Sequence, residues 1–145
     1  MKKKTIVPYF FMVMIMVLAA CNATGNQAGS ATNQESPAAQ FPTGKFTAPD
    51  DQYSGFYYYD DGTSAYFQDG SILVEGTYTI DGDILTDTVG GLAAEEEGCG
   101  DPATYRWSYD GTNLKFALVG TDNCPGRNST MDGSTWVYAG PAPAR

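Results

Sequence analysis

The sequence predicts an all-β protein whose folded part is a small antiparallel up-and-down β-barrel of about eight strands. From Phe41 onward, five Asp-Gly pairs separate short runs of aromatic and β-branched residues. Asp-Gly between such runs is a strong hairpin signal, because a type I′ turn requires positive φ at both central residues. Strands joined by tight turns leave two exposed edges unless the sheet closes, so a barrel is favoured over a sandwich.

The first twenty residues have the layout of an export signal. Lysines at positions 2–4 precede an apolar stretch at 6–17, and small residues follow at 18–20. A permanent membrane helix needs about 20 apolar residues. The apolar stretch here is shorter and is interrupted by Pro8. We therefore expect residues 1–20 to be a cleaved signal peptide.

The segment Leu18-Ala19-Ala20-Cys21 resembles the lipobox of bacterial lipoprotein precursors, in which the cysteine thiol receives diacylglycerol before cleavage. The resemblance implies a mature protein that begins at Cys21 with two or three acyl chains, including palmitate, which give stable membrane anchoring. The residue after the cysteine is Asn22. An aspartate at this position would resemble an inner-membrane retention signal of some Gram-negative bacteria. The expected location is the cell envelope, on the outer face of the cytoplasmic membrane or on the outer membrane.

Residues 21–42 are predicted to form the lipidated cysteine and a flexible linker. From Asn22 to Gln40 the chain has no aromatic or branched aliphatic residue, so it cannot bury enough apolar surface to offset its ordering entropy. As a flexible coil it would span roughly 25 Å. The barrel is expected over residues 43–140, with a short tail at 141–145.

Alternation of apolar and polar residues defines the expected strands and their inner faces. In the fourth strand, one face carries Ile72, Val74, Tyr78 and Ile80, which should point into the core. Alternation with polar or small residues likewise assigns an inner face to two later strands, formed by Tyr105, Trp107 and Tyr109 in one and by Leu114, Phe116 and Leu118 in the other. Gly76, in the middle of that strand, predicts a bulge or a sharp bend. The expected strands are Gly44 to Thr47, Ser54 to Asp60, Thr63 to Gln68, Ser71 to Ile80, Asp83 to Thr88, Ala103 to Tyr109, Thr112 to Val119 and Ser134 to Tyr138.

Three sequence segments resemble parts of the lipocalin-like (calycin) domains of secreted bacterial proteins. Residues 76–85 and 105–116 are similar to the repeating hairpins of those domains, and residues 122–127, followed by Trp136, are similar to their closing segment. The resemblance implies a lipocalin-like barrel that holds a small apolar ligand. The chain is shorter than true lipocalins and lacks their early Gly-x-Trp, which argues against a roomy cavity.

Two cysteines remain once Cys21 is assigned to lipid. Cys99 precedes the strand at Ala103, and Cys124 follows the strand that ends near Val119. If these strands form a hairpin, their outer ends meet at one rim. In an exported protein an even pair favours a disulfide, so Cys99 and Cys124 are predicted to be bonded.

Composition and charge exclude several functions. The net charge is −9, and without the three lysines at 2–4 it becomes −12, which repels nucleic acid and anionic headgroups from the barrel. The chain has no histidine, no Gly-rich phosphate loop and no nucleotide fingerprint, and the acidic run 95–97 matches no calcium-loop spacing. We therefore expect no catalytic residue, no cofactor and no bound metal, and a protein that is not an enzyme.

Two functions remain open. In the first, the barrel binds a small apolar ligand, lined by some of Tyr78, Tyr105, Trp107, Phe116 and Trp136. In the second, these side chains only fill a packed core, and the protein is a structural or interaction module of the envelope. The run Tyr57-Tyr58-Tyr59 would then present aromatic surface to an unidentified protein or glycan partner, since consecutive strand residues point to both faces.

Overall fold

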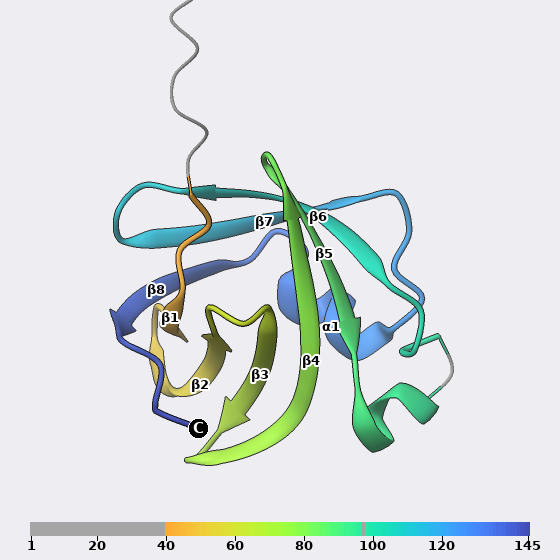
Figure 1. Ribbon diagram of the computed structural model, residues 1–145, viewed down its shortest axis with the longest axis horizontal. Coiled ribbons are helices and arrows are strands. Elements are labelled where there is room, and N and C mark those ends of the chain that lie inside the picture. The colour runs from red at the N-terminus through yellow and green to blue at the C-terminus, as the bar shows by residue number, and fades with distance from the viewer. Residues whose placement is uncertain (1–39, 97) are drawn as a thin grey trace, which may run out of the picture. The chain divides into compact units, whose positions relative to one another are not determined.

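The described residues form a closed barrel of antiparallel strands (Figure 1). A computed structural model describes residues 40–96 and 98–145. Each strand pairs with the next along the chain, and the last pairs with the first, so the barrel is up-and-down as predicted. The strands are β1 (Gly44–Ala48), β2 (Asp51–Tyr58), β3 (Thr63–Gln68), β4 (Ser71–Asp81), β5 (Ile84–Val89), β6 (Ala103–Tyr109), β7 (Asn113–Val119) and β8 (Thr135–Gly140).

The predicted Asp-Gly turns connect four hairpins. Asp69 and Gly70 have φ values of 51° and 78°, and their neighbours Gln68 and Ser71 are paired, as a two-residue turn with positive φ at both positions requires. The fifth pair is not a hairpin, because Asp132-Gly133 links a helix to β8. The Asp132 carboxylate instead accepts a hydrogen bond from the Leu118 backbone N–H, at 2.9 Å.

The predicted inner faces of β6 and β7 are confirmed. Tyr105, Trp107, Leu114 and Phe116 are buried, and they belong to one continuous core cluster with residues from the other strands. Trp136 of β8 is also buried in this cluster, so both tryptophans lie inside the barrel.

The face prediction for β4 is wrong at its ends. Tyr78 is buried, but Ile72 and Ile80 are 49% and 36% exposed. Leu73 is an extra residue in the pairing with β3, and this bulge changes the orientation of the residues before it. Gly76 itself is regularly paired, but a Cβ there would lie 2.6 Å from the Thr88 carbonyl oxygen, so a close approach of β5 requires glycine.

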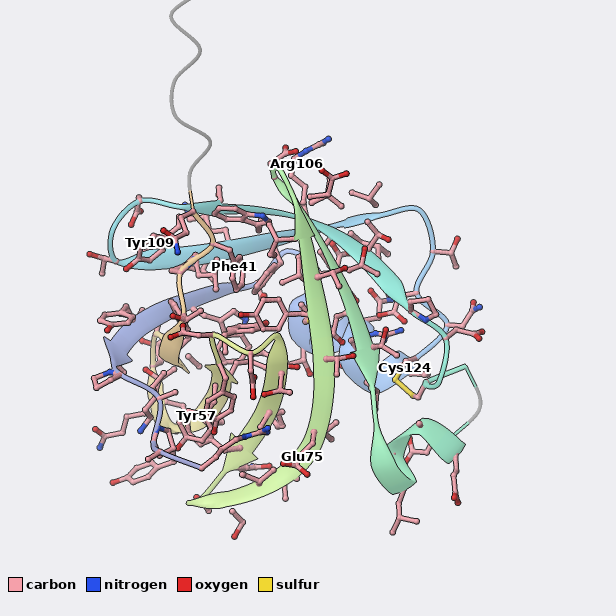
Figure 2. The ribbon with its side chains drawn as sticks, viewed as in Figure 1. Phe41, Tyr57, Glu75, Arg106, Tyr109 and Cys124 are labelled. Atoms are coloured by element: carbon pink, nitrogen blue, oxygen red, sulfur yellow. A yellow bond between two sulfur atoms is a disulfide. The ribbon has the colours of Figure 1, made fainter. Side chains whose placement is uncertain are left out.

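The long connections on either side of the β6–β7 hairpin contain two helices that were not predicted from the sequence. The 3₁₀-helix η1 (Gly91–Glu95) follows β5, and the α-helix α1 (Pro125–Met131) precedes β8. The predicted disulfide joins these connections, since Cys99 follows η1 and Cys124 caps the start of α1 (Figure 2). Pro125 suits the first turn of a helix because it lacks an N–H to satisfy.

Removing the disulfide should cost about 3–4 kcal/mol of unfolding free energy, because the bond closes a loop with a sequence separation of 25 residues. Urea unfolding of the Cys99→Ala/Cys124→Ala variant would measure the loss. The wild-type protein should lose a similar amount on reduction, whereas the variant should not respond to reductant. A variant as stable as the oxidised protein would contradict this expectation.

Phe41 fills one end of the barrel. Its ring is almost completely buried and contacts the rings of Tyr58, Tyr78 and Trp107 at centroid distances of 5.1–5.2 Å. In Figures 1 and 2 this end lies away from η1, at the opposite end of the barrel. The chain from Phe41 onward is therefore part of the core, two residues before the predicted barrel boundary.

The predicted signal peptide and the lipid attachment site at Cys21 lie outside the described residues, as does most of the linker. Neither helix within residues 40–96 and 98–145 has the length and apolar character needed to cross a membrane.

Candidate functional site

A cavity of about 230 Å³ is lined by residues of α1, η1 and strands β2, β3, β4 and β5. We call it the α1 cavity. Exposed residues at its edge, including Leu73 and Glu96, show that it opens to the surface. Both disulfide cysteines also line it, so the bond holds two walls together. Its surface is mainly apolar and includes Phe56, Tyr66, Val74, Val89, Ala93 and Met131.

One wall of the α1 cavity carries a buried charged cluster. Arg127, from α1, donates from Nε and Nη2 to the two carboxylate oxygens of Asp122, at 2.8 and 2.7 Å. The same guanidinium donates to the backbone carbonyls of Asp87 and Asp101. Asp122 also accepts hydrogen bonds from the Tyr105 hydroxyl and from the Cys124 backbone N–H. Arg127 therefore ties α1 to β5 and to the disulfide loop.

Asp87 is the second carboxylate of this cluster, and it lines the cavity. Its Oδ2 lies 3.6 Å from Nη1 of Arg127, which is too long for a hydrogen bond. The Asp87 side chain is only 10% exposed. With two carboxylates and one guanidinium, the cluster carries a net charge of −1 when both acids are ionised.

Burial affects the pKa values of the two acids differently. Burial raises the pKa of Asp87 to about 6, because the favourable effects of Arg127 and the Ser64 hydroxyl only partly offset desolvation and the nearby Asp122 charge. Burial acts in the same direction on Asp122, but hydrogen bonds from Arg127, Tyr105 and Cys124 outweigh it and lower the pKa of Asp122. Asp87 is thus the acid whose ionisation the fold opposes.

Asp87→Asn should stabilise the protein at pH 8. The folded-state pKa of Asp87 lies above its unfolded value, so its favourable contribution is present below about pH 4 and is lost as pH rises through 6. Ionised Asp87 then costs about 3 kcal/mol, part of which the amide variant should recover. The gain, measured by urea unfolding, should disappear near pH 4.

The matched control is Asp83→Asn, which removes an exposed carboxylate whose partner is Arg106. That change should alter stability by less than about 1 kcal/mol. An Asp87→Asn variant that is less stable than wild type at pH 8 would show that the ion pair with Arg127 outweighs the desolvation cost.

The aromatic residues proposed from the sequence lie elsewhere. None of the five lines the α1 cavity; all are buried in the core cluster, and Tyr78 also borders a shallow depression beside Phe41. The Tyr78 hydroxyl donates to the Tyr59 carbonyl at 2.7 Å. Their part in ligand binding stays a prediction. These residues are Tyr78, Tyr105, Trp107, Phe116 and Trp136.

Asp87 and Arg127 are not among the site residues predicted from the sequence. The sequence does contain one indication that Asp87 is unusual, because Asp87 occupies an inward position between Leu85 and Val89 on β5. An acid at such a position is buried, and buried acids cluster at functional sites. Arg127 lies in a segment whose helix was not predicted, so nothing in the sequence placed it beside Asp87.

The tyrosine run of β2 is largely covered by its own chain. Tyr58 points inward and is fully buried, whereas Tyr57 stacks on the Phe67 ring at a centroid distance of 4.5 Å. Arg145, in the predicted tail, lies 4.3 Å from the centre of the Tyr59 ring. Tyr57 and Tyr59 are therefore half-buried on the outer face of the barrel.

No protein-family model, curated protein or solved structure matches this chain. Within residues 40–96 and 98–145, no group of three or more acidic, cysteine or histidine side chains is placed to hold a metal ion. The fold is a closed eight-stranded antiparallel barrel, consistent with a lipocalin-like fold. The candidate site in this barrel consists of a mainly apolar cavity with a buried carboxylate, Asp87, on its wall.

Proposed function

We propose that this protein is a lipid-anchored binding protein of the cell envelope whose barrel holds a small, mainly apolar ligand in the α1 cavity. The observation that carries the proposal is the cavity itself, about 230 Å³ in volume, lined by apolar side chains and a few polar groups. Apolar pockets with a small number of placed polar groups are the usual form of small-molecule sites.

The energetics of the cavity wall support a binding role. A buried carboxylate with a raised pKa costs stability when it is ionised, and an interior optimised for packing alone would not need it. Costly charged groups are common at functional sites, where stability is exchanged for function. We propose no catalysis, since the sequence has no histidine to activate a nucleophile.

The proposed location rests on the lipobox-like segment that ends at Cys21. The barrel would be held at the outer face of the cytoplasmic membrane or at the outer membrane, through acyl chains and the linker. Cys21→Ser should abolish labelling by radioactive palmitate and move the protein out of the membrane fraction. Unchanged labelling of the variant would contradict the proposed anchor.

Binding can be tested with 1-octanol, a neutral probe with a short apolar body. We expect saturable changes in the NMR spectrum at cavity residues. Val74 pairs with the core-packed Tyr66 and lines the cavity, so Val74→Phe should fill the space and weaken binding at least tenfold. The matched control is Val119→Phe at the exposed end of β7, which should leave binding unchanged.

Equal affinity of the Val74→Phe and wild-type proteins would contradict the α1 cavity as the site. Native mass spectrometry of protein purified from its own host offers an independent test. A bound small molecule that is lost in Val74→Phe and retained in Val119→Phe would support the proposal.

The alternative envelope interaction function has less support. It relied on an exposed aromatic surface at Tyr57–Tyr59, but Tyr58 is in the core and the two outer rings are covered by Phe67 and Arg145.

A further inference from the structure

We propose that the α1 cavity selects ligands with a cationic head, such as a primary ammonium, on a short apolar body. This inference rests on the proposed binding function and specifies the chemical class of the ligand. It is carried by the arrangement of charges on the cavity wall.

Arg127 is the positively charged residue among those that line the cavity, and its charge is already neutralised. Asp122 binds its guanidinium through two short hydrogen bonds, and two backbone carbonyls occupy other N–H groups. The Arg127 side chain is also only 4% exposed. An anionic ligand would therefore find no free cation there.

Asp87, in contrast to Arg127, has a charge that no hydrogen-bonded ion pair neutralises. Its carboxylate lies on the cavity wall, nine-tenths buried, and its closest cation is at 3.6 Å. An ionised carboxylate can accept about four hydrogen bonds, so Asp87 retains acceptor capacity toward the cavity. The charge of the cluster remains −1 after Arg127 and Asp122 neutralise each other.

The cavity edge adds negative charge. Glu96 lines the cavity and carries this charge, whereas Glu75, which also lines it, is paired with Arg145 at 3.3 Å in an exposed ion pair. A ligand ammonium would enter past these acids and donate charge-assisted hydrogen bonds to Asp87, which are stronger than neutral ones. The apolar walls formed by Val74, Val89 and Met131 would take the hydrocarbon body.

Three ligands that share one eight-carbon chain isolate the head group: octylammonium, 1-octanol and octanoate. Measured by calorimetry at pH 8, octylammonium should bind at least tenfold more tightly than 1-octanol, and octanoate should bind most weakly. Asp87→Asn should remove the advantage of octylammonium while leaving the affinity for 1-octanol within about threefold of wild type. Asp83→Asn, which removes an exposed acid that does not line the cavity, should change all three affinities by less than threefold.

The salt dependence of octylammonium binding distinguishes a buried contact with Asp87 from a general attraction of cations to an acidic protein. The preference for octylammonium should persist in 0.5 M NaCl, because exposed charges are screened at that ionic strength and buried pairs much less. If octylammonium and 1-octanol bind equally in wild type, the cationic preference is wrong and the proposed binding function stands. If octanoate binds best, or if Asp87→Asn keeps the preference, the inference also fails. If none of the three probes binds, the proposed function fails with it.

Discussion

Arg127→Leu should lower the free energy of unfolding by about 3–5 kcal/mol at pH 8, the usual cost of removing one partner from a buried ion pair. The variant leaves Asp122, whose side chain has no exposed surface, and Asp87 without their cation. It also removes the donors to two backbone carbonyls that hold α1 against the barrel. Chemical unfolding monitored by circular dichroism would measure the loss.

The pH dependence of this loss identifies its cause. Without Arg127, burial should raise the pKa values of both carboxylates in the folded variant, so the variant should recover stability as pH falls from 8 to 5. Adding Asp122→Asn should restore part of the loss at pH 8. Arg106→Leu is the matched control, because its partner Asp83 is at 2.7 Å but both side chains are 62% exposed, and it should cost at most about 1 kcal/mol. Equal effects of the two arginine substitutions would contradict a buried network.

Trp107→Ala should cost about 3–5 kcal/mol, the usual range for deleting a large aromatic side chain from a core. Trp107 is 4% exposed and belongs to the packed cluster, where it meets Phe41 edge-on and faces Phe116 across the β6–β7 pair. Because Trp107 does not line the α1 cavity, the substitution should act on stability, and binding of 1-octanol by the folded fraction should be unchanged.

Trp107→Phe gives a sharper comparison. The indole N–H of Trp107 has no hydrogen-bond partner within the described part of the chain, and a buried donor without an acceptor costs about 1–3 kcal/mol. Phenylalanine keeps an aromatic ring and removes that donor, so the loss should be much smaller than for alanine. A nearly neutral Trp107→Ala would instead place this side chain outside the packed core.

Most of the barrel could be predicted because its signals are local. Asp69-Gly70 marks a hairpin through its own backbone preferences, and the alternation in β6 and β7 distinguishes the two faces without knowledge of the partner strands. The disulfide could also be predicted from local signals, because a hairpin between β6 and β7 brings the two cysteines that flank it to one rim of the barrel.

Where local signals conflict with long-range pairing, the prediction failed. The Leu73 bulge depends on how β4 meets β3, and alternation within β4 alone assigned Ile72 to the core. Helix α1 is short and contains Gly, Asn, Ser and Thr, which are weak helix formers. Its stability comes from tertiary contacts, namely the disulfide at its start and the buried side chains of Arg127 and Met131.

The strand order, the hairpin turns, the faces of the regular strands and the cysteine pairing could all be predicted from the sequence, because each depends on the conformational preferences of neighbouring residues. The position of the candidate site, by contrast, depends on long-range contacts. Arg127 contacts the backbone of Asp87 across a sequence separation of 40 residues, and the cavity is lined by residues of α1, η1 and four strands. Desolvation, which makes Asp87 an unusual acid, is a property of that assembled environment and has no counterpart in the local sequence.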